Sequence, residues 1–266
     1  MKVMNKTFVV TGGANGMGRE IVIKLLKKGA KVAAVDLDNK ALKVLETDLK
    51  EYKDALKTYE LNISNLEGVN TFKDQVLKDF KEVSGLINVA GIIQPFVKVM
   101  DLDYKAIERV MNVNFYGTLY MVKAFLPEFL KLDEGHIINF SSMGGFLPVP
   151  GQAIYGASKA AVKLMTEALY AELRGTNVHV TLVSPGAVKT NIAKHSIEGA
   201  PDKDAGESKH KMLSPEEAAR LTVKAIEKNK LYLYYGSDSR MMNKLYRLMP
   251  KKATNLIANQ MSDLLK

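Results

Sequence analysis

The chain of 266 residues contains no cysteine. Without thiols it forms no disulfide, offers no thiolate to a metal ion and has no cysteine nucleophile. This absence is consistent with a reducing compartment. Histidine is also scarce, and the four copies lack the spacing of metal ligands: they are His136, His179, His195 and His210. We therefore expect no metal site.

Long apolar runs are missing as well. No stretch is long enough to span a bilayer as a helix. The first ten residues, MKVMNKTFVV, run into a predicted strand and have no apolar segment followed by a small-residue cleavage site. We expect no signal peptide and a cytoplasmic protein.

Acidic residues are outnumbered, with 29 Asp and Glu against 38 Lys and Arg and a formal net charge of +9. Such a charge raises the possibility of nucleic-acid binding. However, the lysines are spread over predicted helix surfaces, as at Lys24, Lys27 and Lys28, rather than gathered in one patch. Dispersed cations indicate a solvated surface, so we expect no nucleic-acid partner.

Short β-rich apolar runs alternate with amphipathic stretches along the chain. The predicted strands are residues 7–11, 31–36, 58–61, 85–89, 136–141, 179–183 and 231–235, and helical patterns include 18–28, 40–52 and 68–81. This alternation is typical of parallel strands with right-handed crossovers and helices on both faces. We predict one α/β domain over residues 1–266, a doubly wound seven-stranded parallel sheet with a C-terminal helical extension.

Two helix starts carry a capping box, SNLE at residues 64–67 and SPEE at residues 214–217, the second with proline in the first helical position.

Two other segments depart from the alternation of strands and helices. Residues 190–213 are polar with little apolar periodicity, which predicts a lid over the substrate or a disordered segment. Residues 236–266 continue after the last predicted strand.

A glycine-rich turn follows the first predicted strand and opens a helix. Gly12, Gly16 and Gly18 allow a sharp turn there and let a pyrophosphate approach the backbone, where a helix N-terminus offers N–H groups. The spacing is one residue longer than the common dinucleotide fingerprint. A tight turn without a ligand also favours glycine, so this motif alone is weak.

Asp36 strengthens the dinucleotide interpretation because it ends the second predicted strand. A carboxylate there can accept hydrogen bonds from the adenosine ribose, or it can be a solvated acid beside Asp38. It would repel a 2′-phosphate, and no Arg or Lys at residues 13–17 or at Leu37 offsets its charge. We therefore predict NAD, with NADP disfavoured.

Tyr155 and Lys159 are four residues apart, on one face of a predicted helix, and Ser142 precedes the tyrosine by 13 residues. A free tyrosine has a pKa of about 10, and a nearby ammonium favours its phenolate. Tyr155 can then accept a proton from an alcohol or donate one to a ketone, with Ser142 bound to the same oxygen. A helix that carries Tyr and Lys by chance is common, but the added serine makes chance a poor explanation.

These motifs together resemble the short-chain dehydrogenase/reductase family, over about residues 7 to 235. That family has a Rossmann fold with a TGxxxGxG turn, an NNAG strand end, a Ser and YxxxK site, and a Pro-Gly turn. Here these are residues 11–18, 88–91 (NVAG), Ser142 with Tyr155 and Lys159, and residues 185–186. The family's spacing selects Ser142 over Ser141.

The resemblance implies further roles. Asn114, in VNFYG, holds a water against the active-site lysine, and Lys159 bonds the nicotinamide ribose. The catalytic set is then Asn114, Ser142, Tyr155 and Lys159. The expected cofactor contacts are Gly12, Asn15, Gly16, Met17, Gly18, Asp36, Leu37, Asn62, Ile63, Asn88, Ala90, Gly91, Tyr155, Lys159, Pro185, Gly186, Val188 and Thr190.

Two positions depart from the family pattern. Val89 replaces the second asparagine of the strand end, so one polar contact is lost or made otherwise. Asn62 stands where an aspartate often contacts adenine, and its amide keeps both a donor and an acceptor. Neither change affects the proton-transfer residues.

The predicted walls of the substrate pocket are apolar: Ile92, Ile93, Phe96, Met143, Phe146, Leu147 and Val149. Such walls suit a bulky hydrophobic alcohol or ketone, such as a hydroxysteroid or bile acid. Several of these side chains are equally compatible with an ordinary core. A 3-oxoacyl compound is an alternative substrate.

The tail, residues 236–266, has two helical patterns flanking Pro250 and six Lys or Arg against two Asp. A basic amphipathic tail can lie on an anionic membrane, but we favour packing on protein, over the pocket or against a second subunit. Our hypothesis is that the tail blocks a tetramer contact and leaves a homodimer.

The sequence therefore predicts an NAD-dependent alcohol dehydrogenase or ketoreductase. The rival from another class is a redox-sensing protein that binds NAD without turnover. Such a protein is expected to lose the tyrosine or the lysine, and this chain keeps both.

Overall fold

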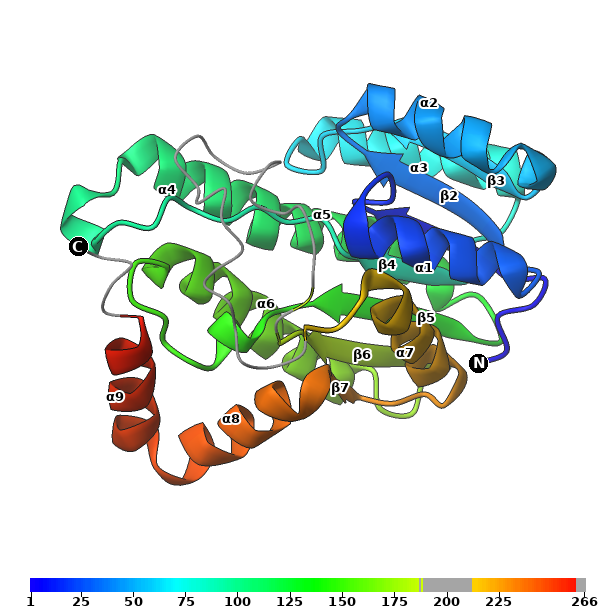
Figure 1. Cartoon of the computed structure of the whole chain (residues 1–266). Helices are drawn as coiled ribbons and strands as arrows, with labels where there is room; N and C mark the ends of the chain where they lie inside the picture. Colours follow the sequence, from blue (N-terminus) through cyan, green and yellow to red (C-terminus); the bar gives the residue numbers. More distant parts are fainter. Residues whose placement is uncertain (187, 189–211, 262–266) are drawn as a thin grey trace.

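A parallel sheet forms the centre of the protein. The computed structural model describes residues 1–186, 188 and 212–261 (Figure 1). The strand order is β3-β2-β1-β4-β5-β6-β7, and every pairing is parallel, which confirms the predicted seven-stranded doubly wound sheet. The strands are β1 (Thr7–Thr11), β2 (Lys31–Asp36), β3 (Leu56–Glu60), β4 (Gly85–Asn88), β5 (Gly135–Phe140), β6 (Val178–Ser184) and β7 (Tyr232–Tyr234).

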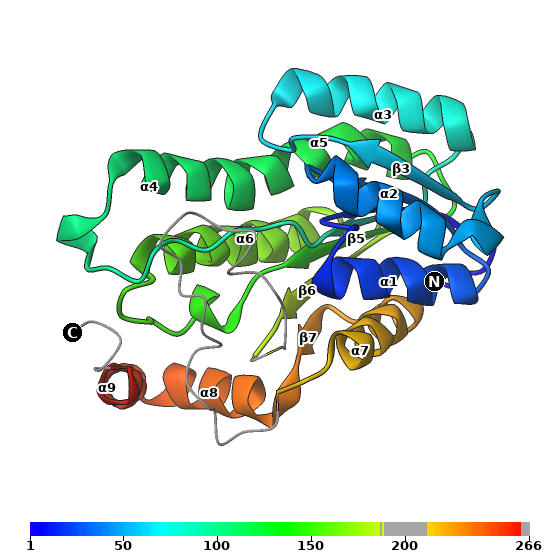
Figure 2. The ribbon, with the colours of Figure 1, turned by 45° about the horizontal axis from the view of Figure 1, so that its top comes forward.

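Helices cover both faces of the sheet. They are α1 (Gly16–Lys27), α2 (Asn39–Asp48), α3 (Leu66–Phe80), α4 (Tyr104–Met111), α5 (Thr118–Phe129), α6 (Ala153–Glu172), α7 (Pro215–Glu227), α8 (Gly236–Leu248) and α9 (Pro250–Gln260). One buried cluster joins the sheet to α1, α2 and α7, and a second joins it to α3, α5 and α6 (Figure 2). Along β1, Phe8 and Val10 belong to the first cluster and Val9 to the second, because successive strand side chains point to opposite faces.

The two predicted capping boxes have different outcomes. Ser214 is the N-cap of α7 and its Oγ accepts a hydrogen bond from Glu217 N at 3.2 Å, as predicted. Ser64 is wrong as a cap, because Asn65 caps α3 instead. The N–H and hydroxyl of Ser64 both donate to Asn62 Oδ1, at 3.0 and 2.7 Å. Ser64 therefore belongs to a local turn after β3, and the helix begins one residue later than predicted.

Several helices and strands begin or end at residues other than the predicted ones. β3 begins at Leu56 rather than at residue 58, because Leu56 pairs with Val32 of the neighbouring strand. The helix expected over residues 40–52 ends at Asp48, and a 3₁₀ turn, η1 (Lys50–Tyr52), follows it. Amphipathic periodicity continues through such a turn, so the sequence pattern did not reveal the break.

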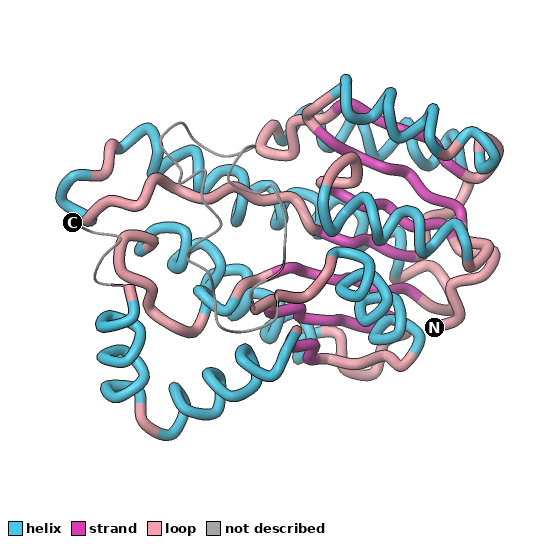
Figure 3. Tube along the Cα trace, viewed as in Figure 1, coloured by secondary structure: helices cyan, strands magenta, loops and turns pink. Residues whose placement is uncertain are grey.

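The C-terminal extension forms two helices on either side of Met249, as the sequence predicted. In Figure 3, α8 and α9 make a V that projects from the edge of the sheet. Its inner side buries Met242, Ala253 and Ile257 against Leu147, in the loop after β5. The tail therefore packs on the protein's own loop. Among the described residues, no helix combines the length and the apolar character needed to cross a membrane.

Candidate active site

A cavity of about 400 Å³ lies at the carboxyl ends of the central strands. The chain reverses its direction of strand addition between β1 and β4, and such switch points are where open α/β sheets bind ligands. Of the predicted cofactor contacts, these line the cavity: Gly12, Asn15, Gly16, Met17, Gly18, Asp36, Leu37, Asn62, Ile63, Ala90 and Gly91. The other lining residues are Val35, Leu61, Ser64, Val89, Ile92, Arg109 and Val113.

The glycine turn has a geometry that other residues do not fit. Gly12 and Gly16 have φ angles of +65° and +52°. A Cβ on Gly18 would lie 1.9 Å from the carbonyl oxygen of Gly12. The Asn15 side chain makes no capping bond to α1, so no cap occupies the first-turn N–H groups on the cavity wall. The turn is thus a backbone cradle of the kind that accepts a pyrophosphate.

Asp36 is fixed at the end of β2 by the same turn. Its Oδ2 accepts a hydrogen bond from Ala14 N at 3.1 Å, and its Oδ1 accepts one from Asp38 N at 3.1 Å. These bonds hold the charge at the cavity wall. The sequence analysis did not identify Arg109 as a site residue. Among the described residues that line this cavity, it is the one with a cationic side chain. Arg109 comes from α4, and no local pattern linked it to the glycine turn.

Ser142 and Tyr155 meet at the end of β5. Ser142 follows the strand, and its Oγ accepts a hydrogen bond from Gly144 N at 3.1 Å. Tyr155 is in the first turn of α6. Burial raises the pKa of the Tyr155 phenol because it penalises the phenolate, and a hydrogen bond with Ser142 lowers that pKa in part. The sequence led us to expect a lowered pKa, and in the protein alone burial dominates instead.

Lys159 is one turn after Tyr155 and is almost fully buried, at 4% exposure. Its Nζ donates a hydrogen bond to Phe140 O at 3.1 Å, so the ammonium is tied to the end of β5. Burial lowers its pKa to about 8. Ser141, the neighbouring serine, is buried and donates to Lys159 O at 2.7 Å. Of the two serines, Ser142 is therefore the one that interacts with the Tyr155 phenol.

Asn114 lies in a π-helical segment, η3 (Asn112–Gly117), between α4 and α5. Its buried amide forms two bonds with the backbone of Ile92: Nδ2 donates to Ile92 O at 2.9 Å, and Oδ1 accepts from Ile92 N at 2.8 Å. Nδ2 also donates to Ser158 Oγ at 3.0 Å. π-Helical turns inside helices are frequent at functional sites because they redirect side chains. Here the turn aims Asn114 at the loop after β4.

Gly91 passes between the two buried polar residues of this site. A Cβ there would lie 3.0 Å from Lys159 Nζ and 3.2 Å from Asn114 Oδ1. Those remaining predicted contacts that the structure describes lie off the cavity wall. The Asn88 amide donates to Asn139 Oδ1 at 2.9 Å, across β4 and β5. Pro185 O accepts from Met143 N at 2.9 Å, and Val188 bridges to Leu213. Thr190, most of the predicted lid at residues 190–213, and His195 and His210 lie outside the described residues.

The buried ammonium leads to a prediction on stability. We expect Lys159→Met to stabilise the fold at neutral pH by on the order of 1–3 kcal/mol, because the depressed pKa costs about 3 kcal/mol and the lost hydrogen bond to Phe140 offsets part of the gain. The unfolded chain keeps this proton up to pH 10.5 and the folded chain up to about pH 8. The unfolded state therefore binds more protons between these values, and wild-type stability rises with pH there.

Urea unfolding of both proteins across that window measures the effect. The stability advantage of Lys159→Met is full below pH 8 and shrinks towards pH 10.5. Lys163→Met, on the same helix but at a partly exposed position where the lysine is paired with Glu167, is the control, and we expect no such advantage for it. A Lys159→Met advantage that is absent, or constant with pH, contradicts the burial argument.

The fold, the cradle and the switch-point cavity define a doubly wound α/β protein of the nucleotide-binding type. Residues 6–200 match the short chain dehydrogenase family, and the chain belongs to it. It is an oxidoreductase of that family, which confirms the resemblance seen in the sequence.

Comparison with known proteins agrees. The chain is 33% identical over 260 residues to the Mycobacterium tuberculosis protein named "Putative oxidoreductase SadH", covering 95% of this chain and 94% of that protein. It is 33% identical over 188 residues to 3beta-hydroxysteroid dehydrogenase 2 of Eggerthella lenta, covering 70% and 72%.

Two solved structures are similar over almost the whole chain. A short-chain dehydrogenase/reductase from Burkholderia phymatum in complex with NAD has a TM-score of 0.83 and 27% identity, covering 93% of this chain and 96% of that one. A short-chain dehydrogenase from Burkholderia cenocepacia in complex with NADP has a TM-score of 0.80 and 27% identity, covering 97% and 99%.

Proposed function

We propose that the protein interconverts a secondary alcohol and a ketone with NAD as the redox partner, and that Tyr155 moves the proton. The observation that carries this proposal is the Ser142–Tyr155 pair after the carboxyl end of β5, at the same edge of the parallel sheet as the glycine cradle that follows β1. When bound, NADH would supply a hydride to the ketone carbon, and NAD would take one from the alcohol carbon. The protein's part is to bind, orient and transfer a proton.

The cradle and Asp36 support the choice of NAD. The glycine turn leaves backbone space that a Cβ would fill, and the Asp36 carboxylate is held at the wall by two backbone N–H groups. Asp36 is placed to accept from ribose hydroxyls and to repel a 2′-phosphate. We further propose that Lys159 and the segment 185–190 hold the nicotinamide end. The related structures contain NAD in one case and NADP in the other.

The pKa of Tyr155 sets the preferred protonation state. Burial raises it, so the phenol is the resting form near neutrality and is ready to donate to a ketone oxygen. Oxidation needs the phenolate, so it is favoured as the pH rises. Ser142 donates a hydrogen bond to the same substrate oxygen. Asn114 and Lys159 complete the proposed proton path to solvent.

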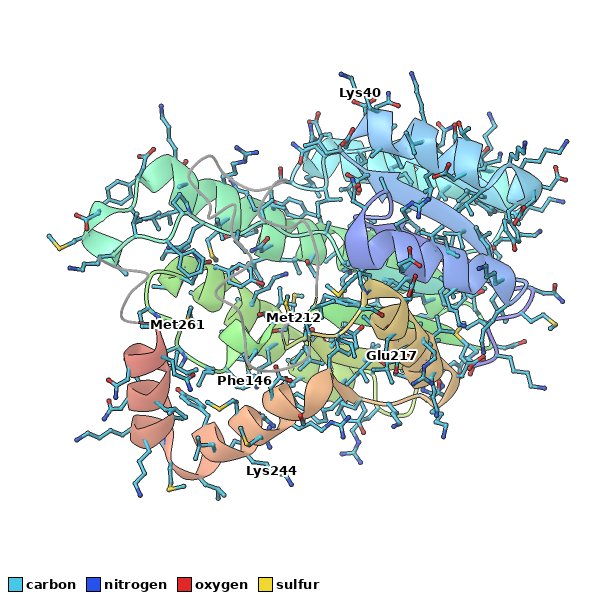
Figure 4. The ribbon with its side chains drawn as sticks, in the orientation of Figure 1. Lys40, Phe146, Met212, Glu217, Lys244 and Met261 are labelled. Atoms are coloured by element: carbon cyan, nitrogen blue, oxygen red, sulfur yellow. The ribbon has the colours of Figure 1, made fainter. Side chains whose placement is uncertain are left out.

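The surroundings of the pair favour a bulky apolar substrate. Met143, Phe146 and Val149 follow Ser142 and pack against the buried cluster of Leu147 and the tail, as do Leu245, Tyr246 and Met261. Figure 4 shows Phe146 beside α8, with Lys244 on the outer side of that helix. A hydroxysteroid or bile acid is the substrate class we propose, and the Eggerthella relative is named as a hydroxysteroid dehydrogenase. We also propose that the protein is a homodimer.

A substrate panel tests the proposal. Hydroxysteroids, bile acids, hydroxyacyl compounds and sugars are assayed as alcohols at alkaline pH, and the matching ketones at neutral pH, with each nicotinamide cofactor. We expect a hydroxysteroid or bile acid with NAD to have the highest kcat/KM, because the walls are apolar. Preference for hydroxyacyl compounds would instead indicate a 3-oxoacyl reductase. NAD binding without turnover of any compound would indicate a redox sensor.

A further inference from the structure

Gln94 is a buried polar residue that no sequence motif singled out. It lies in the loop after β4, between apolar neighbours, and is 0% exposed. Its side-chain Oε1 accepts hydrogen bonds from Ile154 N and Tyr155 N, both at 2.9 Å. Its Nε2 donates to Gly151 O at 3.0 Å. Both ends of the amide are therefore used, and all of these partners are at the start of α6.

These bonds cap the helix that carries Tyr155. The first N–H groups of an α-helix have no partner inside the helix and need an acceptor when they are buried. Gln152, the residue before α6, makes no side-chain capping bond. Gln94 supplies that acceptor from a loop 60 residues earlier in the chain. Its Oε1 accepts a hydrogen bond from the backbone N–H of Tyr155 itself, so Gln94 holds the backbone from which the phenol extends.

The cap closes a ring of buried and partly buried hydrogen bonds. Ser158 Oγ donates to Tyr155 O at 2.7 Å and accepts from Asn114 Nδ2 at 3.0 Å. The Asn114 amide in turn holds both backbone groups of Ile92, two residues before Gln94. The ring therefore joins the β4 loop, the π-helical turn and the start of α6. Tyr155 is held at its N–H by Gln94 and at its carbonyl by Ser158.

We propose that Gln94 is a positioning residue for Tyr155, and that it sets the distance of the phenol from Ser142 and the substrate oxygen. This inference rests on the proposed function, in which Tyr155 transfers the proton. A displacement of about 1 Å at a reacting group can cost about 100-fold in rate. Loss of the cap should therefore lower kcat without weakening dinucleotide binding, because Gln94 does not line the cofactor cavity.

The test compares Gln94→Met with Gln152→Met. Methionine fills a similar volume without the amide, so each variant loses hydrogen bonds and little packing. Gln152 Nε2 donates to Gln94 O at 2.9 Å, so its loss breaks a buried bond between the same two segments but leaves the α6 cap intact. For both variants we measure kcat, NADH dissociation constant, the pH dependence of alcohol oxidation, and amide hydrogen exchange at Ile154 and Tyr155.

We expect Gln94→Met to exchange these two amides faster and to lose about 10- to 100-fold in kcat, with an unchanged NADH dissociation constant. The Ser142 bond lowers the pKa of Tyr155, so a displaced phenol loses that effect and the apparent pKa of oxidation rises. Gln152→Met should keep the wild-type pH profile and kcat within about twofold.

Three outcomes would overturn the inference. The first is a Gln94→Met protein with wild-type kcat while Tyr155→Phe is inactive, which leaves the proposed function standing. The second is an equal loss of kcat in both methionine variants, with the same pH profile. A role of Gln94 in the fold alone predicts that result. The third is a Tyr155→Phe protein as active as the wild type, which removes the proposed function as well.

Discussion

Tyr155→Phe is expected to reduce turnover by about 100- to 10,000-fold, the range attributed to a general acid or base. The change removes one hydroxyl and keeps the ring, so the fold and the cofactor cavity should persist. The reason for the large expected effect is that the phenol is the proposed proton donor to the ketone oxygen. It interacts with Ser142, and burial raises its pKa, so it stays protonated near neutrality.

Steady-state kinetics with the best compound of the substrate panel measures the loss, and fluorescence titration with NADH measures the affinity. Affinity should change by less than about threefold, because Tyr155 does not line the cavity where most of the predicted dinucleotide contacts lie. Tyr170→Phe is the matched control: it makes the same change later on α6, at an exposed position, and should leave kcat unaltered. Turnover that survives in Tyr155→Phe would exclude this residue as the proton donor.

Asp36→Asn is expected to raise the ratio of kcat/KM for NADP to that for NAD by about 10- to 100-fold, which corresponds to about 1.4–2.8 kcal/mol. The substitution keeps an amide oxygen for Ala14 N and removes the charge that repels a 2′-phosphate. Arg109 lines the same cavity, and its charge acts in the opposite sense. We therefore expect the wild type to prefer NAD by less than an isolated carboxylate would give.

Asp38→Asn provides the control, because Asp38 carries the same charge two residues later but does not line the cavity. Its Oδ1 caps α2 by accepting from Ala41 N at 3.0 Å, a role that asparagine also fills. The cofactor ratio of this variant should stay at the wild-type value. Wild-type kcat/KM higher with NADP than with NAD, or an Asp36→Asn ratio equal to that of the wild type, would count against the electrostatic argument.

Much of the fold followed from local patterns. Strands and helices have different apolar periods, so the alternation of short runs and amphipathic stretches gave the parallel sheet and its order of elements. The glycine turn and the Ser142, Tyr155 and Lys159 spacing gave the family. Boundaries and caps followed less closely: Asn65 rather than Ser64 caps α3, because the Ser64 hydroxyl donates to the Asn62 side chain instead.

The electrostatics of the site were harder to read from the chain. The spacing of Tyr155 and Lys159 suggested an ammonium that lowers the phenol pKa. In the fold the Lys159 ammonium donates to Phe140 O, and burial raises the pKa of Tyr155. Burial is a sum over neighbours from many elements, so an i, i+4 spacing does not report it.

The sequence by itself determined the class of fold, the family and the residues proposed for catalysis, because each depends on motifs within short stretches of chain. Only the tertiary structure decided which side chains support them. It placed Arg109 on the cofactor cavity, packed the tail on the loop at Leu147, and set Gln94 on the amide of Tyr155. These partners are brought together by the packing of separate helices and loops on the sheet, and no periodicity or spacing along the chain encodes that proximity.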